Sequence, residues 1–450
     1  MRLRFGHARL APLAAALAAL AAPAVAAPDF APAVAQDYRG HLEALFLDFH
    51  RNPELSYRET RTAAIIAREL RAAGAEVTEG VGGTGVVGIM RNGEGPTVLV
   101  RADMDGLPVR EQSGLPYAST ARQTGIDNVE APVMHACGHD VHITSLIGTA
   151  RQLARLRDRW RGTIVLVAQP AEERIGGARA MIEDGLYTRF PKPEYALAFH
   201  VSADLPTGRV LVQPGLVASS ADSVDILIHG VGTHGAYPHE GRDPIVMGAQ
   251  IIMALQTLVS REISPLTPGV VTVGAFHAGL KHNIISDRAE MQLTVRSNDE
   301  AVRRTLLDGI RRIAANVGRM AGMAEDRLPE VRVSTESTAP TINDSAAAAR
   351  VRAAMAAALP EGTMLDPMPQ TGMGAEDFAY FVQPEHGVRG VYFSVGGTPQ
   401  AAFDAARAGG PPVPSHHSPL FRISPEPSVR LGTEAMVVAV LDLMRPSGGR

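Results

Sequence analysis

The chain has a single cysteine, Cys137, among its 450 residues. One thiol cannot form an intramolecular disulfide, so this thiol is inert, reactive or a metal ligand. Lysine is almost as scarce, and arginine supplies nearly all of the basic charge. The sequence also has no heptad pattern, internal repeat or low-complexity tract. These absences exclude a disulfide scaffold, a coiled coil and a repeat array.

A strong excess of one charge is also absent, because the formal net charge is −4. Such mild acidity argues against nucleic acid or a polybasic membrane surface as a partner. The one long apolar run lies at the N-terminus, behind three arginines and ahead of Ala24–Ala26. This pattern predicts a signal peptide over residues 1–27 and a secreted or periplasmic mature protein. A retained membrane anchor is the less favoured alternative, because the run is short and contains two prolines.

Buried strands alternate with amphipathic helices over much of the mature chain. Thr97–Val100, Ile164–Val167 and Tyr195–Phe199 are short apolar runs of the kind found in strands buried on both faces. A helical pattern over 139–157 separates the first two. The alternation predicts an α/β fold with a mainly parallel sheet.

The pattern changes between residues 218 and 335. Strands with alternating apolar residues and two helices follow one another there in the order β-α-β-β-α-β. This order predicts a ferredoxin-like α+β module that serves as a lid or dimerisation unit. It would interrupt a catalytic domain made of residues 36–217 and 336–445, and the chain length fits two domains.

Polar residues gather where the predicted strands end. Asp103 and Asp105 follow the first strand, the pair Glu172–Glu173 follows the second, and His200 follows the third. Ligands bind at this edge of open α/β sheets. Adjacent carboxylates repel each other, and a dication relieves this by binding one and leaving the other free as a base. The alternative is a solvated acidic turn.

The nine residues Met134–His142 contain three histidines, an aspartate and the cysteine. Thiolate, imidazole and carboxylate are ligands of divalent transition metals. Cys137 and His139 stand two apart, directly before the predicted helix, whereas the flanking histidines are assigned supporting roles. His417 lies in a later Pro/His-rich loop, where the adjacent His416 is a rival ligand.

Several motifs follow one another along the chain: His135–Asp140, Gln169–Glu173, His234–His239 and Met373–Phe378, with Pro53–Ser56, Asn283–Asp287 and His417–Pro419 beside them. Together they resemble the hippurate hydrolase, auxin-conjugate hydrolase and N-acyl-amino-acid amidohydrolase branch of the dinuclear-metal aminoacylase and carboxypeptidase family. The resemblance covers nearly all of the mature chain. It implies two divalent metal ions per subunit. The metal would be zinc, or alternatively manganese, cobalt or nickel.

The resemblance also assigns roles to residues. It implies five metal ligands: Cys137, His139, Glu173, His200 and His417. Glu172 would be the general base, and Asp105 would steady the metal site. His234 of the inserted module would complete the active site of a partner subunit, which implies a homodimer or larger assembly. Asn283 and Arg296 are candidates for binding the substrate carboxylate.

The expected activity is hydrolysis of the amide bond of N-acyl amino acids, with metal-activated water and a glutamate base. The small-molecule substrate would carry an acetyl, benzoyl or indoleacetyl group. Two alternatives stay open. One is a metallo-carboxypeptidase or dipeptidase with the same site, and the other is a periplasmic binding protein that has the fold and does no chemistry.

Overall fold

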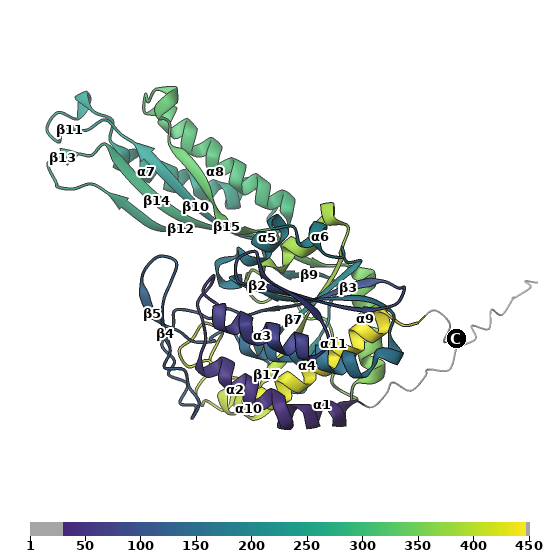
Figure 1. Cartoon of the computed structure of the whole chain (residues 1–450). Helices are drawn as coiled ribbons and strands as arrows, with labels where there is room; N and C mark the ends of the chain where they lie inside the picture. Colours follow the sequence, from purple (N-terminus) through teal and green to yellow (C-terminus); the bar gives the residue numbers. More distant parts are fainter. Residues whose placement is uncertain (1–29, 447–450) are drawn as a thin grey trace, which may run out of the picture.

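The computed structural model describes residues 30–446, so the predicted signal peptide lies outside the described residues. Two lobes are visible in Figure 1. The larger lobe contains a seven-stranded sheet, and the smaller contains a four-stranded sheet, here called the lid. Each lobe has its own apolar core.

The large sheet has the strand order β1-β2-β6-β3-β7-β17-β8. Its four central strands run parallel, as predicted, and antiparallel strands flank them on both sides. Strands β1 and β2 form a hairpin around Gly82 and Gly83. The strands are β1 (Glu76–Val81), β2 (Gly85–Asn92), β3 (Thr97–Asp103), β6 (Gly162–Gln169), β7 (Tyr195–Pro206), β8 (Val210–Leu211) and β17 (Arg389–Thr398).

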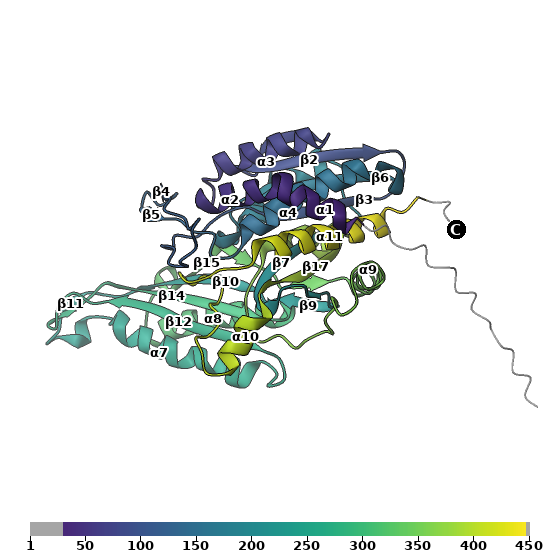
Figure 2. The same cartoon turned by 90° about the horizontal axis from the view of Figure 1, so that it is seen from below.

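Helices cover both faces of this sheet (Figure 1), and Figure 2 shows those of the lower face. This cover explains why the central strands are mostly apolar. One face carries α1 (Ala31–Asp37), α2 (Glu43–Arg51), α3 (Thr60–Ala72), α4 (His139–Arg155), α9 (Ser345–Ala358) and α11 (Pro425–Leu443). The other face packs against α5 (Gly177–Glu183), α6 (Leu186–Arg189) and a 3-10 segment over Asp377–Val382.

The strand register places Asp103 and His200 at the same height along the parallel strands. Asp103 is paired with Gln169 across β3 and β6, and Arg101 with Ala198 across β3 and β7. His200, two residues further along β7, is therefore level with Asp103. The strand does not end at His200 as expected, because β17 pairs with β7 as far as Pro206.

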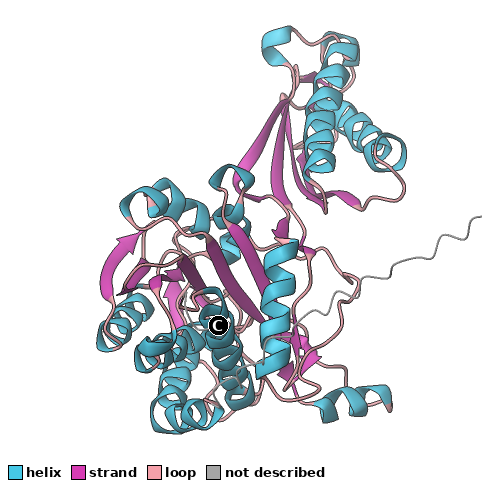
Figure 3. Cartoon of the chain, turned by 90° about the vertical axis from the view of Figure 1, so that its right-hand side faces the viewer, coloured by secondary structure: helices cyan, strands magenta, loops and turns pink. Residues whose placement is uncertain are grey.

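The lid is an antiparallel sheet in the order β12-β14-β10-β15, with its two long helices on one side of the sheet (Figure 3). Its strands and helices follow the chain as β10 (Ala221–His229), α7 (Pro244–Thr257), β12 (Gly269–Ala278), β14 (Arg288–Ser297), α8 (Glu300–Met320) and β15 (Glu330–Thr338). Both the element order and the strand order are those of a ferredoxin-like module, so this prediction is confirmed.

Helix α7 is the most apolar element of the lid. With the π-helical turn Leu258–Glu262 it has the length and hydropathy of a membrane span, although core helices meet the same criterion. Met247, Ile251 and Leu255 on one face are buried in the lid core. The remaining short elements are β4 (Arg122–Thr124), β5 (Glu130–Pro132), β9 (Gly215–Ala218), β11 (Thr233–His234), β13 (Ile284–Ile285), β16 (Thr341–Asn343) and α10 (Gln400–Arg407).

Candidate metal centre

Cys137 and His139 flank the start of helix α4. Gly138 between them has φ +86°, a left-handed conformation that glycine adopts without strain, and it occupies the N-cap position. This turn directs the thiol and the imidazole into the same buried space. The Sγ atom of Cys137 lies 3.4 Å from His200 Nε2 and 3.7 Å from His416 Nδ1.

A hydrogen bond from Nδ1 orients the ring of His139. Nδ1–H donates a hydrogen bond of 2.8 Å to the backbone carbonyl of Asp105. The lone pair of Nε2 then faces the acidic residues, at 3.9 Å from the nearest carboxylate oxygens of Glu172 and Glu173. Although it is buried, this Nε2 has no hydrogen-bond partner within the described part of the chain.

Glu173 offers a second buried atom of the same kind. Its Oε1 has no hydrogen-bond partner among residues 30–446. Its Oε2 lies 3.4 Å from Nε2 of His417, which reaches the cluster from the predicted Pro/His-rich loop. That loop is tied to the first motif, because the backbone N–H of His417 donates to the carbonyl of Ala136 at 2.8 Å. His417 also has φ +64°, a strained conformation for this residue.

Apart from His417, these side chains belong to overlapping groups whose ligand atoms lie within 4.8 Å of one another. Within the described ranges they include Cys137/His139/Glu173, Cys137/His200/His416 and Asp103/His139/Glu172. Buried unpartnered nitrogen and oxygen atoms beside a thiol are the donor set that zinc and similar cations take. The residues present therefore fit divalent metal ions.

His142 also lies in this cluster but has no nitrogen to spare. Its Nδ1–H donates to Asp103 at 2.5 Å, and its Nε2 accepts the backbone N–H of Val201 at 2.8 Å. Because both ring nitrogens are used in these hydrogen bonds, the arrangement favours a supporting role for His142. Val201 itself is fully buried in the core.

His416 and His417 differ in their surroundings. The Nε2 atom of His416 accepts the backbone N–H of Ala203 at 3.0 Å, so its neutral ring carries the proton on Nδ1, which faces Cys137. In this tautomer His416 directs an N–H at the sulfur of Cys137 and has no nitrogen lone pair left to bind a cation. The side chain of His417 is 55% exposed, and its Nε2 is open towards Glu173. The arrangement favours His417 as the ligand and gives His416 a supporting role.

The electrostatics of the cluster reflect an excess of buried negative charge. Burial, and then Glu376 and Glu173, raise the pKa of Glu172 well above its usual value. Burial likewise raises the pKa of Glu173 to about 8. Burial alone would lower the pKa of His139, but Asp103 and Asp105 outweigh it and raise that pKa to about 10. A bound cation would favour the deprotonated forms of these side chains, which are the forms that bind metal.

Asp105 contacts the backbone of the glutamate pair. Its two carboxylate oxygens accept the backbone N–H groups of Glu172 and Glu173, each at 3.1 Å. The hydroxyl of Ser56 donates to the same carboxylate at 2.6 Å. Asp105 thus connects the glutamate pair with the loop that orients His139.

A buried arginine lies behind the site, and the sequence analysis gave it no role. Arg101 forms ion pairs with Asp103 and Glu376, both at 2.7 Å, and with Asp377 at 3.2 Å. It is 2% exposed and stands inside strand β3. An arginine in an otherwise apolar strand that is buried on both faces must have buried acidic partners, and this position was the signal for them in the sequence. The motif Met373–Phe378 supplies two of them.

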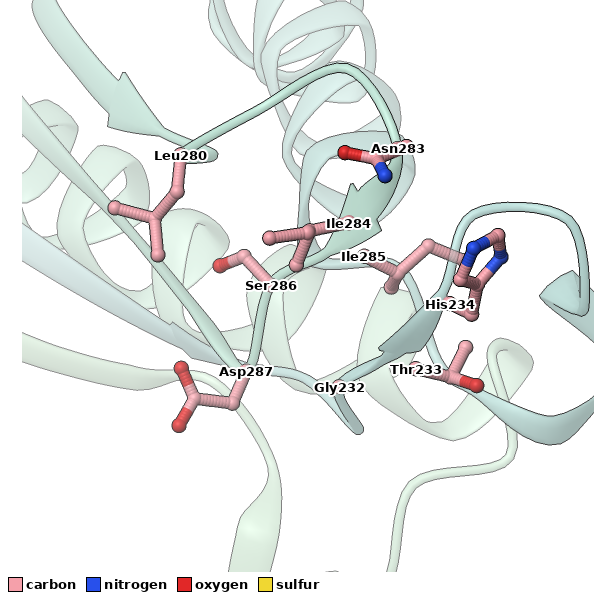
Figure 4. Close-up of a pocket in the computed structure, with 9 residues that line it drawn as sticks. All are labelled: Gly232, Thr233, His234, Leu280, Asn283, Ile284, Ile285, Ser286 and Asp287. Carbon is pink, nitrogen blue, oxygen red and sulfur yellow. The ribbon is translucent and has the colours of Figure 1, made fainter.

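The predicted lid residues lie elsewhere in the structure. His234 and Asn283 face a pocket of about 460 Å³ formed by the segments around β11 and β13 (Figure 4). Figure 1 places these two strands at the free end of the lid. Arg296 lies on β14, where its Nε–H donates to Thr294 at 3.2 Å. The described chain thus assembles the ligand cluster without bringing His234 or Asn283 to it.

Comparison with known proteins explains the arrangement. Residues 99–406 match the model of the family described as peptidase family M20/M25/M40. The chain belongs to this family. The M20 assignment agrees with the aminoacylase and carboxypeptidase resemblance drawn from the motifs.

Individual relatives cover most of the chain. It is 39% identical over 351 residues to Thermostable carboxypeptidase 2 of Saccharolobus solfataricus, a match to 77% of this chain and 83% of that protein. It is 38% identical over 316 residues to the hippurate hydrolase of Campylobacter jejuni, covering 69% and 77% of the two chains. The crystal structure of the Bacillus subtilis YXEP protein, described as a dinuclear metal binding peptidase from the M20 family, superposes with a TM-score of 0.71. That match is 28% identical and covers 91% of this chain and 99% of the other.

M20 membership confirms several predictions made from the sequence. The fold is the expected α/β fold with an inserted lid, and the protein is a metal-dependent amidohydrolase of a family that includes hippurate hydrolase and carboxypeptidase. The structure adds the clustered ligand residues.

Proposed function

We propose that the protein is an exported M20 amidohydrolase that cleaves N-acyl amino acids at a site holding two divalent metal ions. The proposed ligands are Cys137, His139, Glu173, His200 and His417. The observation that carries the proposal is the buried cluster of thiol, imidazole and carboxylate around two unpartnered atoms, Nε2 of His139 and Oε1 of Glu173. Similarity to a hippurate hydrolase supports N-acyl amino acids as the substrate class.

The thiolate and imidazole ligands suit zinc best, with manganese, cobalt and nickel as alternatives. When bound, such ions supply Lewis acidity that polarises the amide carbonyl and lowers the pKa of water. The dinuclear metal binding described for the YXEP protein supports this composition.

Glu172 is the proposed general base. It accepts a proton from the attacking water and later donates it to the leaving nitrogen, so one carboxyl serves both steps. Its high pKa, caused by burial and by the neighbouring acids Glu376 and Glu173, suits a group that must hold a proton between the steps. Asp105 fixes the backbone of the pair, which leaves the Glu172 side chain directed at the site.

A second copy of the chain is the proposed partner. His234 lies at the free end of the lid, so it can hydrogen-bond the oxyanion of the intermediate only in the site of a neighbouring subunit. Helix α7 beside it exposes Ile245 by 40%, Val246 by 53% and Met253 by 72%. An apolar helix face of this kind is typical of an interface. Asn283 and Arg296 would then hold the substrate carboxylate.

A carboxypeptidase or dipeptidase activity is the second candidate, and similarity to Thermostable carboxypeptidase 2 favours it. The two activities share the ligands and the base, and they differ in the acyl side of the cleaved bond. The deciding experiment compares acetyl-, benzoyl- and indoleacetyl-amino acids with dipeptides under identical metal loading. A higher kcat/KM on the acyl amino acids supports the first candidate, whereas a preference for dipeptides overturns it in favour of the second.

Export is proposed from the N-terminal pattern. The basic start, the apolar run and Ala24–Ala26 are the features that support it. The test is fractionation of expressing bacteria, with expression of a chain lacking residues 1–27 as the control. Activity of the full-length chain in the exported fraction supports the proposal, and its retention in the cytosol in uncleaved form contradicts it.

A further inference from the structure

The turn that carries the glutamate pair is strained on both sides. Ala171 has φ +50° and Ile175 has φ +51°, in the left-handed region that residues with a side chain rarely adopt. Three other non-glycine residues in the described part of the chain share this feature. Such conformations persist only where the surroundings fix them, and they gather at functional sites. Neighbouring side chains must therefore hold this turn in place.

Three consecutive backbone N–H groups of the turn donate to two buried carboxylates. Ala171 donates to Oε1 of Glu59 at 2.8 Å, and the next two amides donate to the oxygens of Asp105 at 3.1 Å each. Glu59 is fully buried, and its second oxygen accepts the hydroxyl of Thr84 at 2.5 Å. The carboxylate of Glu59 thus holds the strained Ala171, and the hydroxyl of Thr84 in turn fixes that carboxylate.

Glu59 stands at the N-cap position of helix α3, but its side chain makes no capping bond to that helix. The carboxylate of Glu54 takes the amides of Arg61 and Thr62 instead, at 3.1 and 2.7 Å. The Glu59 side chain is therefore free to cross from the helix to the turn. A carboxylate buried without a full counter-charge is costly, so this placement calls for a role.

We infer that Glu59 is a positioning residue for the reaction. By holding Ala171 in its left-handed conformation, it fixes the direction of the next side chain, the proposed base Glu172. This inference rests on the proposed function, because it assigns Glu59 an effect on the step in which Glu172 takes part. It acts through the backbone and contacts neither substrate nor ligand atoms.

The test compares Glu59→Ala and Glu59→Gln in the full-length, metal-loaded protein. A misplacement of about 1 Å costs roughly 100-fold in rate, so Glu59→Ala should lower kcat by about that factor while KM stays within about twofold. Glu59→Gln keeps an oxygen that can accept the Ala171 amide and should recover most of the rate. Activity is expressed per folded, metal-loaded molecule, so that a loss of stability alone does not change it.

Glu69→Ala is the matched control, because Glu69 is a buried glutamate of the same helix that pairs with His41 and Arg68, away from the turn. It should leave kcat unchanged. If Glu59→Ala does not fold, Thr84→Val tests the same anchor with a smaller expected loss of kcat. Unchanged kcat in the folded Glu59 or Thr84 variants, or no recovery in Glu59→Gln, overturns the inference.

Amide hydrogen exchange over residues 170–174 separates this inference from the proposed function. Loss of the Glu59 acceptor should speed exchange of the Ala171 amide in Glu59→Ala, and the Glu69 control should not. This readout needs no substrate, so it stays decisive even if the wild-type protein cleaves no N-acyl amino acid. Exchange at wild-type rates in Glu59→Ala would show that Glu59 does not hold the turn.

Discussion

Glu172 and Glu173 are neighbours in sequence, yet their side chains have different surroundings. Glu173 lies beside Cys137, His139 and His417, whereas Glu172, which is equally close to His139, lies among the acids Glu376 and Asp377. In the proposed function Glu173 binds metal and Glu172 acts as the base. The pair would then divide two tasks that one carboxylate cannot perform at once.

Replacing Glu172 by Gln should therefore stop turnover and spare metal binding. General bases contribute about 10²–10⁴-fold, so kcat should fall by at least that factor. Metal content by elemental analysis should stay within error of wild type, because Gln removes the charge and keeps the shape. A Glu172→Gln protein with substantial activity would remove this residue from the base role.

The sequence indicated candidate ligands by residue type: a lone cysteine two positions from a histidine, and two adjacent glutamates after a strand. The family resemblance, and not the pattern alone, assigned their roles. The ion pairs of Arg101 with Glu376 and Asp377 were not predictable, because they join segments 275 and 276 residues apart. The family resemblance already implied His417 rather than His416 as the ligand, and the structure adds a physical reason, because Nε2 of His416 accepts the Ala203 amide.

At the scale of elements, the start of helix α4 sets the spacing of two proposed ligands. A Cβ atom added to Gly138 would lie 2.4 Å from the buried Val201 side chain, and the left-handed φ would be strained. Gly138→Ala should therefore move Cys137 relative to His139. We expect metal affinity to fall by about 10–100-fold, the loss typical when the support of a ligand is disturbed.

The measurement is a competition titration with a metal-chelating dye. Gly208→Ala is a suitable control, because Gly208 also has a positive φ, of +80°, but lies in a turn with open space around it. Equal metal affinity in Gly138→Ala and wild type would show that the turn at α4 does not control the ligand spacing.

A buried histidine links helix α2 to the start of α4. His50 hydrogen-bonds Asp140 at 2.7 Å and Glu111 at 3.2 Å. Burial alone would lower the pKa of His50, but these two acids outweigh it and raise the pKa to about 9. Because the folded pKa exceeds the unfolded value of about 6.5, the charged form stabilises the fold.

His50→Gln should therefore lower the free energy of unfolding most at low pH, by up to roughly 3 kcal/mol. The contribution is fully present below about pH 6.5 and is lost as the pH rises through about 9. Denaturant titrations of both proteins between pH 6 and 10 give the difference. A difference that stays constant or grows with pH would contradict the charged state of His50.

Element order was largely predictable, and element ends were not. The apolar alternation gave the lid its β-α-β-β-α-β order, because one face of each strand packs on α7 or α8. The extension of β7 beyond His200 depends on pairing with β17, almost 200 residues later in the chain. The hairpin β4–β5 was not predicted, because its strands are only three residues long and have no apolar alternation.

At the scale of the whole molecule, the lid presents an apolar helix face next to a pocket that contains His234. A second copy that covers this face would explain both features. Val246→Glu combined with Met253→Glu should then yield a monomer, because two charges would be buried in the interface. Light scattering after size exclusion measures the mass, and the activity of the monomer should fall because His234 cannot reach a neighbouring site.

Thr305→Glu with Asn316→Glu is the matched control for this pair. It adds the same charge to the other lid helix, α8, at positions that are already polar and exposed. It should change neither mass nor activity if the apolar face of α7 is the interface. A wild-type protein that is monomeric and fully active would contradict the role proposed for a second copy.

The central claim is that the cluster around Cys137 and His139 binds two metal ions on which activity depends. The most direct measurement is elemental analysis of the purified protein before and after chelation, coupled to hydrolysis of an N-acyl amino acid. The account predicts about two divalent ions per chain, a dinuclear content like that described for the YXEP protein. It also predicts loss of activity on chelation, recovery on adding metal, and loss of metal in Cys137→Ser. A protein that stays fully active after its metal is removed, or a Cys137→Ser variant with unchanged metal content and affinity, would contradict the account.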